Sequence, residues 1–147
     1  MNNKYEFKAT RLIAETFEDH GIKFGVESHG GVEMLLAGFP IECGPNVLVS
    51  FASHDDDNDV SIRLFSLLSG IPDEKRLDVM TACNELNRKA RYIKCYIDSD
   101  GDVNIEYDIP VRCPDEAIGE VALEMLLRLK KILDGEYGHF MRALYAD

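Results

Sequence analysis

Two alternating runs joined by an Asp-Gly turn are the feature of this sequence that most constrains its fold. Apolar side chains recur at every second position over residues 93–97 and again over residues 103–109, and Asp100-Gly101 lies between the two runs. A period of two places the apolar side chains on one face of a strand, and Asp-Gly is a strong turn dipeptide. The stretch therefore predicts a β-hairpin with one buried and one polar face.

The same stretch also looks like the beginning of an EF-hand calcium loop, because Asp98, Asp100 and Asp102 occupy alternate positions. Such a loop needs a glycine at its sixth position and a bidentate acid at its twelfth. Counted from Asp98, these positions hold Val103 and Ile109, and strand patterns rather than helices flank the loop. The hairpin interpretation is favoured, and we expect no metal here.

Similar patterns divide the rest of the chain into helices and strands. The expected helices cover residues 4–20, 70–90 and 113–145, and the expected strands before the second helix cover residues 23–27, 32–39, 47–53 and 60–68. The pattern thus gives four strands before the second helix. Gly135 and Gly138 favour a break near the end of the last helix.

These elements predict an α+β fold in which an antiparallel sheet is flanked by helices. The expected order from the pattern is helix, four strands, helix, two strands, helix. A length of 147 residues fits one domain spanning 1–147.

The charge of the chain excludes several classes of partner. Its 27 acidic and 16 basic residues give a net charge of −11, which repels nucleic acids and anionic membranes.

The N-terminus lacks the apolar segment of a signal peptide, and no apolar run approaches the roughly 20 residues of a membrane helix. The cysteines at 43, 83, 95 and 113 form no C-x-x-C pair, so we expect a reduced, cytoplasmic protein without a disulfide framework.

No group of residues in the sequence indicates catalysis. The four histidines are scattered, and Cys43, the thiol expected to be most exposed, has no identifiable base beside it. The segment 54–59, HDDDND, combines a histidine with carboxylates, but neighbouring side chains on a strand diverge, so a solvated hairpin tip is favoured over a metal site. We therefore expect a protein that is not an enzyme and needs no cofactor. An enzyme that uses Cys43 or the acidic turns is the alternative.

Asn84 and Asn87 are unusual because asparagine has a low helix propensity and both lie near the end of the second helix. They are explained either by capping of a frayed helix end or by anchoring of the helix to the following hairpin or to a partner. We assign them to a candidate partner or dimer surface, whose members are Met80, Asn84, Asn87, Met125, Leu129 and Ile132.

Residues 84–112, NELNRKARYIKCYIDSDGDVNIEYDIPVR, resemble the YbjN family, bacterial proteins described as sensory transduction regulators. The matching features are the N-x-x-N near a helix end, the alternating strand, the D-x-D-G-D turn and the strand that ends in D-I-P. The resemblance implies a fold similar to that of type III secretion chaperones, which are usually dimeric. It also implies three strands before the second helix, which puts the strand at 23–27 in doubt and leaves the number of strands there at three or four. It transfers no catalytic residue to this chain.

Together these observations predict a small acidic protein that acts as a regulator, adaptor or chaperone by binding other proteins, and that forms a homodimer. Its mechanism would be the capture of a partner's extended apolar segment on the sheet or along a helix groove. Two alternatives stay open, namely a type III secretion effector chaperone and a sensory module that binds a small ligand between sheet and helix.

Overall fold

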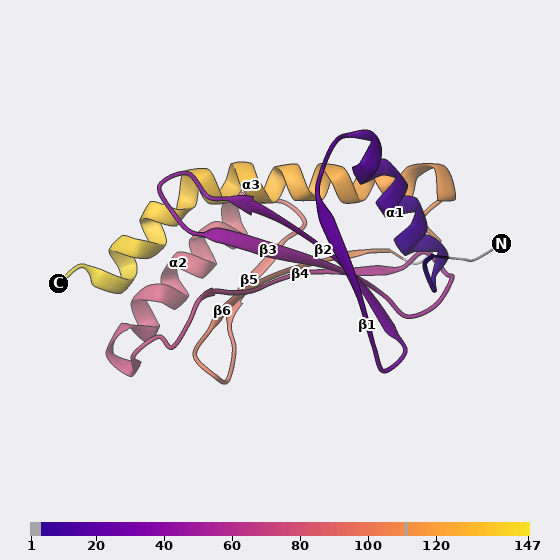
Figure 1. Ribbon diagram of the computed structural model, residues 1–147. Helices are drawn as coiled ribbons and strands as arrows, with labels where there is room; N and C mark the ends of the chain where they lie inside the picture. The colour runs from indigo at the N-terminus through magenta and orange to yellow at the C-terminus, as the bar shows by residue number, and fades with distance from the viewer. Residues whose placement is uncertain (1–3, 111) are drawn as a thin grey trace.

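The computed structural model describes residues 4–110 and 112–147, which contain three α-helices, a short 3-10 helix and six strands (Figure 1). In chain order these elements are α1 (Lys8–Asp19), β1 (Phe24–His29), β2 (Val32–Pro40), β3 (Asn46–Ser53), β4 (Val60–Leu68), η1 (Asp73–Lys75), α2 (Arg76–Lys89), β5 (Lys94–Ile97), β6 (Val103–Ile109) and α3 (Asp115–Tyr145). The predicted α+β class and element order are confirmed. The uncertain first strand exists, so four strands precede α2.

All six strands form one antiparallel sheet in the order β1-β2-β3-β4-β6-β5. β3 and β4 pair only where Ser50–Ala52 faces Ser61–Arg63. Beyond these pairs the two strands run apart toward the end at which the C-terminus lies (Figure 1). A bulge at Ser66, which has a positive φ of 57°, shifts the register of β4 against β6.

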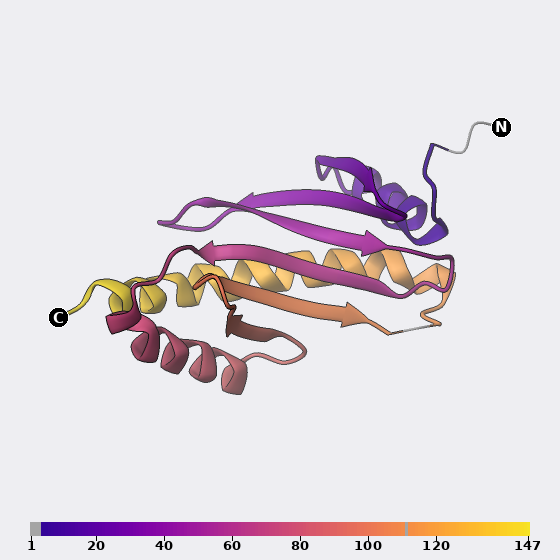
Figure 2. The same ribbon diagram turned by 90° about the horizontal axis from the view of Figure 1, so that it is seen from below.

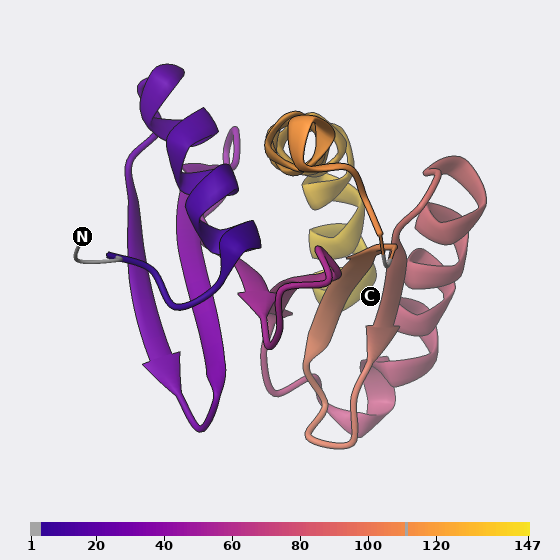
Figure 3. The ribbon, with the colours of Figure 1, turned by 90° about the vertical axis from the view of Figure 1, so that its right-hand side faces the viewer.

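The helices lie on one side of this sheet. The Phe17 ring of α1 packs edge-on against Phe51 of β3, with 5.4 Å between centroids, and Cys83 of α2 contacts Cys95 of β5. The ladder pairs place Phe51 and Cys95 on the same face. In Figure 2 the strands lie in front of α3, and Figure 3 shows α2 beside β5 at the sheet edge. Within residues 4–110 and 112–147, no helix covers the second face, which we call the open face.

The two faces of β2 differ in what covers them. Glu33 and Leu35 point into the core and are buried, while Met34 and Leu36 are half-buried on the open face. Both phases of this strand carry apolar residues, so its pattern alone could not decide which face the helices cover.

Glu33 also determines where α1 begins. Its carboxylate accepts hydrogen bonds from the backbone N–H groups of Glu6 at 2.8 Å and Phe7 at 3.0 Å, and Asp56 accepts one from the Lys8 N–H at 2.8 Å. These donors precede or open the helix and have no helical partner. The helix therefore starts at Lys8, later than the predicted residue 4.

The last helix is continuous from Asp115 to Tyr145, so the predicted break at Gly135 and Gly138 is wrong. Two glycines cost about 2 kcal/mol of helix propensity. Burial beyond them offsets this cost, because Phe140 is fully buried and Tyr137 and Met141 pack against the core.

The acidic loop between β5 and β6 is a hairpin turn, as predicted. One oxygen of Asp98 accepts the backbone N–H groups of Asp100 and Asp102, and the other accepts the Asn104 amide. Asp102 accepts hydrogen bonds from Gly70 N–H and Ser66 Oγ. The carboxylates of Asp98 and Asp102, two of the three acids that a calcium loop would offer to the ion, are thus engaged by the turn and by residues 66 and 70.

Acid is expected to weaken this turn. The backbone N–H of Asp102 and then the Asn104 amide hold the pKa of Asp98 below its ordinary value of 3.8. A carboxyl with a lowered folded pKa stabilises fully above the unfolded value and loses this contribution as the pH falls through the folded pKa. We therefore expect the free energy of unfolding, measured in urea between pH 5 and pH 2, to fall less steeply in Asp98→Asn than in the original protein.

Asp100→Asn is the matched control for this measurement. Asp100 lies in the same turn and is exposed, but its carboxylate accepts no hydrogen bond among the described residues. The control should keep the pH dependence of the original protein. Equal slopes for Asp98→Asn and Asp100→Asn would contradict the role given to the Asp98 carboxylate.

Of the helices within the described ranges, none combines the length and the apolar character needed to cross a membrane.

Candidate protein-binding surface

The open face carries apolar side chains over β2, β3 and β4. Leu48 on β3 is 55% exposed and Phe65 on β4 is 60% exposed, and Met34 and Leu36 on β2 are half-buried on the same face. Leu48 lies opposite Gly38 on β2, two residues along from Leu36. We call these four residues the open-face patch. Large apolar side chains gathered on one uncovered face are a recognised sign of a binding surface.

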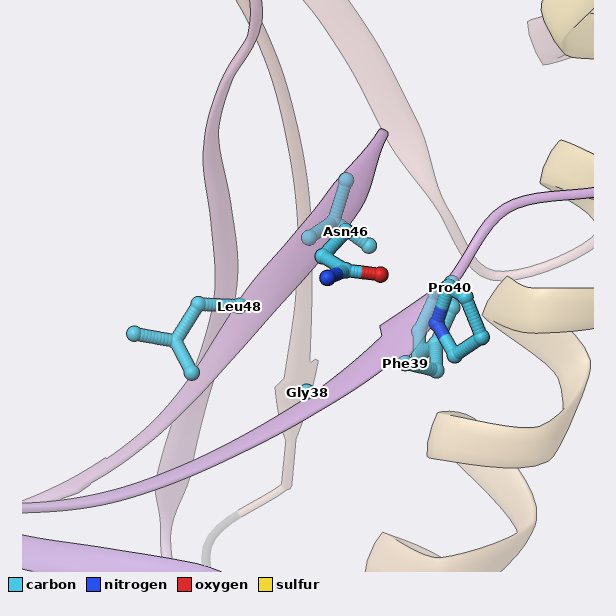
Figure 4. A pocket seen from close by; sticks show the side chains of 6 residues that line it. Gly38, Phe39, Pro40, Asn46 and Leu48 are labelled. Carbon is cyan, nitrogen blue, oxygen red and sulfur yellow. The ribbon is translucent and has the colours of Figure 1, made fainter. Parts of the chain in front are cut away.

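A groove adjoins this patch at the ends of β2 and β3 (Figure 4). It has a volume of about 420 Å³ and is lined by Gly38, Phe39, Pro40, Asn46, Val47 and Leu48. The close-up shows Leu48 projecting from β3 away from the helix at the right of the view. Gly38 leaves the floor open, and a Cβ at this position would lie 2.8 Å from the Val47 carbonyl oxygen.

At this groove β2 runs past its edge neighbour β1, although Pro40 has no N–H and its carbonyl oxygen accepts a hydrogen bond from Lys130 Nζ at 2.9 Å. β1 pairs with β2 only as far as Phe24 and Ala37, so residues 38–40 extend past the neighbouring strand. An extended peptide can add to such an edge through main-chain hydrogen bonds. The groove therefore combines an apolar wall with a strand edge.

The other half of the open face is charged. Glu106 lies at the centre, with Arg63 Nε at 3.0 Å, Lys94 Nζ at 2.5 Å and Tyr96 Oη at 3.1 Å from its carboxylate. Burial raises the pKa of Glu106, but the hydrogen bond from Lys94 and the charge of Arg63 outweigh it and leave the pKa below its ordinary value. The partners of Glu106 belong to β4 and β5, so this cluster ties three strands together.

Three of the predicted surface residues lie together at α2. Met80, which is 51% exposed, Asn84 and Asn87 line a cavity of about 320 Å³ between α2 and β5. Ile132 lies elsewhere, in a cavity of about 260 Å³ between α2 and α3. A partner surface at Met80, Asn84 and Asn87 stays a prediction.

Met125 and Leu129 do not belong to any surface of this chain. They are only 3% and 2% exposed, because they lie on the apolar side of α3 that packs in the core against α1 and the sheet. Assigning them to a partner surface was wrong, since the sequence pattern shows a wide apolar stripe but not what covers it.

The hydrogen bonds of Asn87 explain why an asparagine occurs near the end of α2. Its side-chain Nδ2 donates to the Cys95 carbonyl oxygen at 3.0 Å, and the Cys95 N–H donates to Asn87 Oδ1 at 2.8 Å. We call these two bonds the Asn87 bridge. The amide pairs with the outer edge of β5 as a neighbouring strand would, so the anchoring interpretation is correct for Asn87. Asn84 is exposed and makes no comparable bond among the described residues.

The β3–β4 turn brings together side chains that the sequence pattern kept apart. His54 Nε2 lies 3.2 Å from Asp55 and 3.9 Å from Asp59. Burial raises the pKa of Asp59, while the backbone N–H of Asp57 lowers that of Asp55. The three side chains offer ligand atoms that lie within 4.8 Å of one another, as a metal site would need. The prediction that no metal binds stays a prediction.

The open-face patch was missed in the sequence although a signal for it was present. Leu48 and Phe65 occupy the polar phase of their strands, and Met34 and Leu36 make β2 apolar on both faces. Apolar residues on both phases indicate either a second covering layer or an exposed patch.

Comparison with known proteins places the chain in a family. No curated protein matches the sequence. The model of the YbjN family, whose description is "Putative bacterial sensory transduction regulator", matches residues 11–129. This range begins in α1 and ends within α3, so it includes the whole sheet. The chain therefore belongs to the YbjN family.

Proposed function

We propose that this protein is a non-enzymatic regulator of the bacterial cytoplasm that binds another protein through the open face of its sheet. The family description supports a regulatory role, and the exposure of Leu48 and Phe65 on an uncovered face is the observation that carries the binding function. No group on this face combines a nucleophile with a base among the described residues.

The proposed occupant is an extended segment of a partner protein that carries apolar residues interspersed with lysine or arginine. The groove runs along a strand edge, which favours an added strand over a helix. The net charge of −11 favours a basic segment over an acidic one. A type III secretion effector chaperone is a narrower form of this proposal, in which the segment belongs to secreted cargo.

Cross-linking inside the native cell tests the proposal. A photoreactive amino acid is placed at Leu48 and, separately, at Phe65, with Leu127 of α3 as the matched control because it is 56% exposed. We expect the same partner protein to be cross-linked from positions 48 and 65 and to be absent at 127. Adding Leu48→Asp should abolish the adduct at 65.

Four outcomes would contradict the proposal. Equal adducts at all three positions, or none at any, would remove the special role of the open face. Adducts with a second copy of the chain alone would make this face a dimer interface. A small-molecule adduct would favour the second candidate, a ligand sensor, since about 420 Å³ lies within the usual range of small-molecule sites.

We further propose that the protein is a homodimer joined at β1. This edge strand is six residues long and has no bulge or proline, whereas the opposite edge, β5, is short and is bonded by Asn87. Antiparallel pairing of two copies about Gly25 would set Lys23 opposite Glu27 and Phe24 opposite Val26. Light scattering should then give twice the chain mass of 16.6 kDa.

A further inference from the structure

Two of the four cysteines meet in the core although twelve positions separate them in the sequence. Cys83 of α2 and Cys95 of β5 place their sulfur atoms 3.5 Å apart, and the Cys95 thiol donates a hydrogen bond to Cys83 Sγ. Cys43 is exposed and Cys113 is half-buried. The contact therefore singles out one pair of thiols.

The pair is buried, yet a cavity reaches it. Cys83 is 4% exposed and Cys95 is 3% exposed. Both line the cavity of about 320 Å³ between α2 and β5, together with Arg76, Met80, Asn84 and Asn87. A cavity of this volume has room for a small oxidant such as hydrogen peroxide.

We propose that Cys83 and Cys95 form a redox-reactive pair that a peroxide converts into a disulfide linking α2 to β5. A disulfide requires the sulfurs to approach to about 2.05 Å. The Asn87 bridge already holds α2 against the Cys95 backbone. Cys83 lies four residues before Asn87, on the same side of the helix, so a small shift of α2 brings the sulfurs together.

The hydrogen bond between the thiols assigns their roles. It lowers the pKa of Cys83, because the donated S–H favours the Cys83 thiolate. The same bond, followed by burial, raises the pKa of Cys95. Cys83 is therefore the nucleophile and Cys95 the resolving thiol.

The reaction takes two steps and consumes one hydrogen peroxide. The Cys83 thiolate attacks one peroxide oxygen, the O–O bond breaks, and the departing hydroxide takes a proton to leave as water, so that Cys83 becomes a sulfenic acid. Cys95 sulfur then attacks Cys83 sulfur and the S–O bond breaks. The hydroxyl group leaves with the Cys95 proton as a second water. The two thiols are oxidised by two electrons and the peroxide is reduced by two.

Mass spectrometry of the folded chain tests the proposal. The Cys43→Ser/Cys113→Ser variant keeps only the pair and is treated with hydrogen peroxide without denaturant. We expect the intact mass to fall by two hydrogen atoms and a thiol reductant to restore it. Trypsin should then release residues 77–88 joined to residues 95–112, because each peptide holds one of the two cysteines.

Two further variants separate the thiols. Adding Cys95→Ser leaves Cys83 alone, and its sulfenic acid should be trapped by a dione reagent. Adding Cys83→Ser leaves Cys95 alone. Its rate of reaction with hydrogen peroxide should be lower than that of Cys83 by a factor of about ten or more. Circular dichroism confirms that each variant is folded.

The proposal is overturned if the pair keeps both thiols under peroxide, if the link forms only in urea, or if Cys83 and Cys95 react equally fast when alone.

Discussion

Replacing Gly119 with alanine is expected to destabilise the protein by about 2–3 kcal/mol, the upper range for overpacking a close contact. Gly119 lies where α1 crosses α3. A Cβ built there would lie 1.9 Å from Thr16 Oγ1, 2.9 Å from Thr16 Cβ and 3.1 Å from the Leu12 carbonyl oxygen. Rotation of Thr16 removes only the first of these contacts, so the helices must move apart. The movement would disturb Phe17, which is fully buried on α1. Urea denaturation measures the loss.

Gly135→Ala is the matched control, because it makes the same change in the same helix. A Cβ at Gly135 meets nothing within 4 Å, so the alanine should stabilise the helix by about 0.5–1 kcal/mol. The two variants should therefore shift the urea midpoint in opposite directions. A shift in the same direction would contradict either the close crossing at Gly119 or the continuity of α3 at Gly135.

Elements with a clear period were predictable from the sequence. The hairpin of β5 and β6 has alternation on both arms and a turn dipeptide, and these local signals are sufficient to predict it. The covered face of β2 was not predictable, because Leu35 and Leu36 are equally apolar and only the position of α1 decides between them. The length of α3 was not predictable either, since the burial of Phe140 outweighs two unfavourable glycines.

The candidate sites depend still more on contacts between distant segments. Nothing local distinguishes Met125, which is buried, from Met80, which is exposed. The contact between Cys83 and Cys95 requires the chain to fold back after α2 so that β5 packs against the helix. The sequence predicts both elements but not the distance between them. Asn87 was noticed for its low helix propensity, and only the structure identifies its partner. A residue that violates its local preference was thus a sound pointer to a specific contact.

Replacing Asn87 with alanine is expected to lower the free energy of unfolding by about 2 kcal/mol, because two hydrogen bonds are lost and the Cys95 N–H and carbonyl groups are left partly buried without partners. The loss is concentrated at β5, a strand of four residues whose other side pairs with β6. Hydrogen exchange should therefore accelerate at the Cys95 amide more than in the centre of the sheet.

Asn84→Ala removes the same side chain one turn earlier in α2, where it is exposed. The free energy of unfolding should change by less than about 0.5 kcal/mol, and the better helix propensity of alanine favours a small gain. Asn87→Asp refines the comparison, since a carboxylate still accepts the Cys95 N–H but cannot donate to its carbonyl. Its stability should lie between those of Asn87→Ala and the original protein. If both alanine variants lost equal stability, helix propensity or fraying, and not the bond to Cys95, would explain the asparagines.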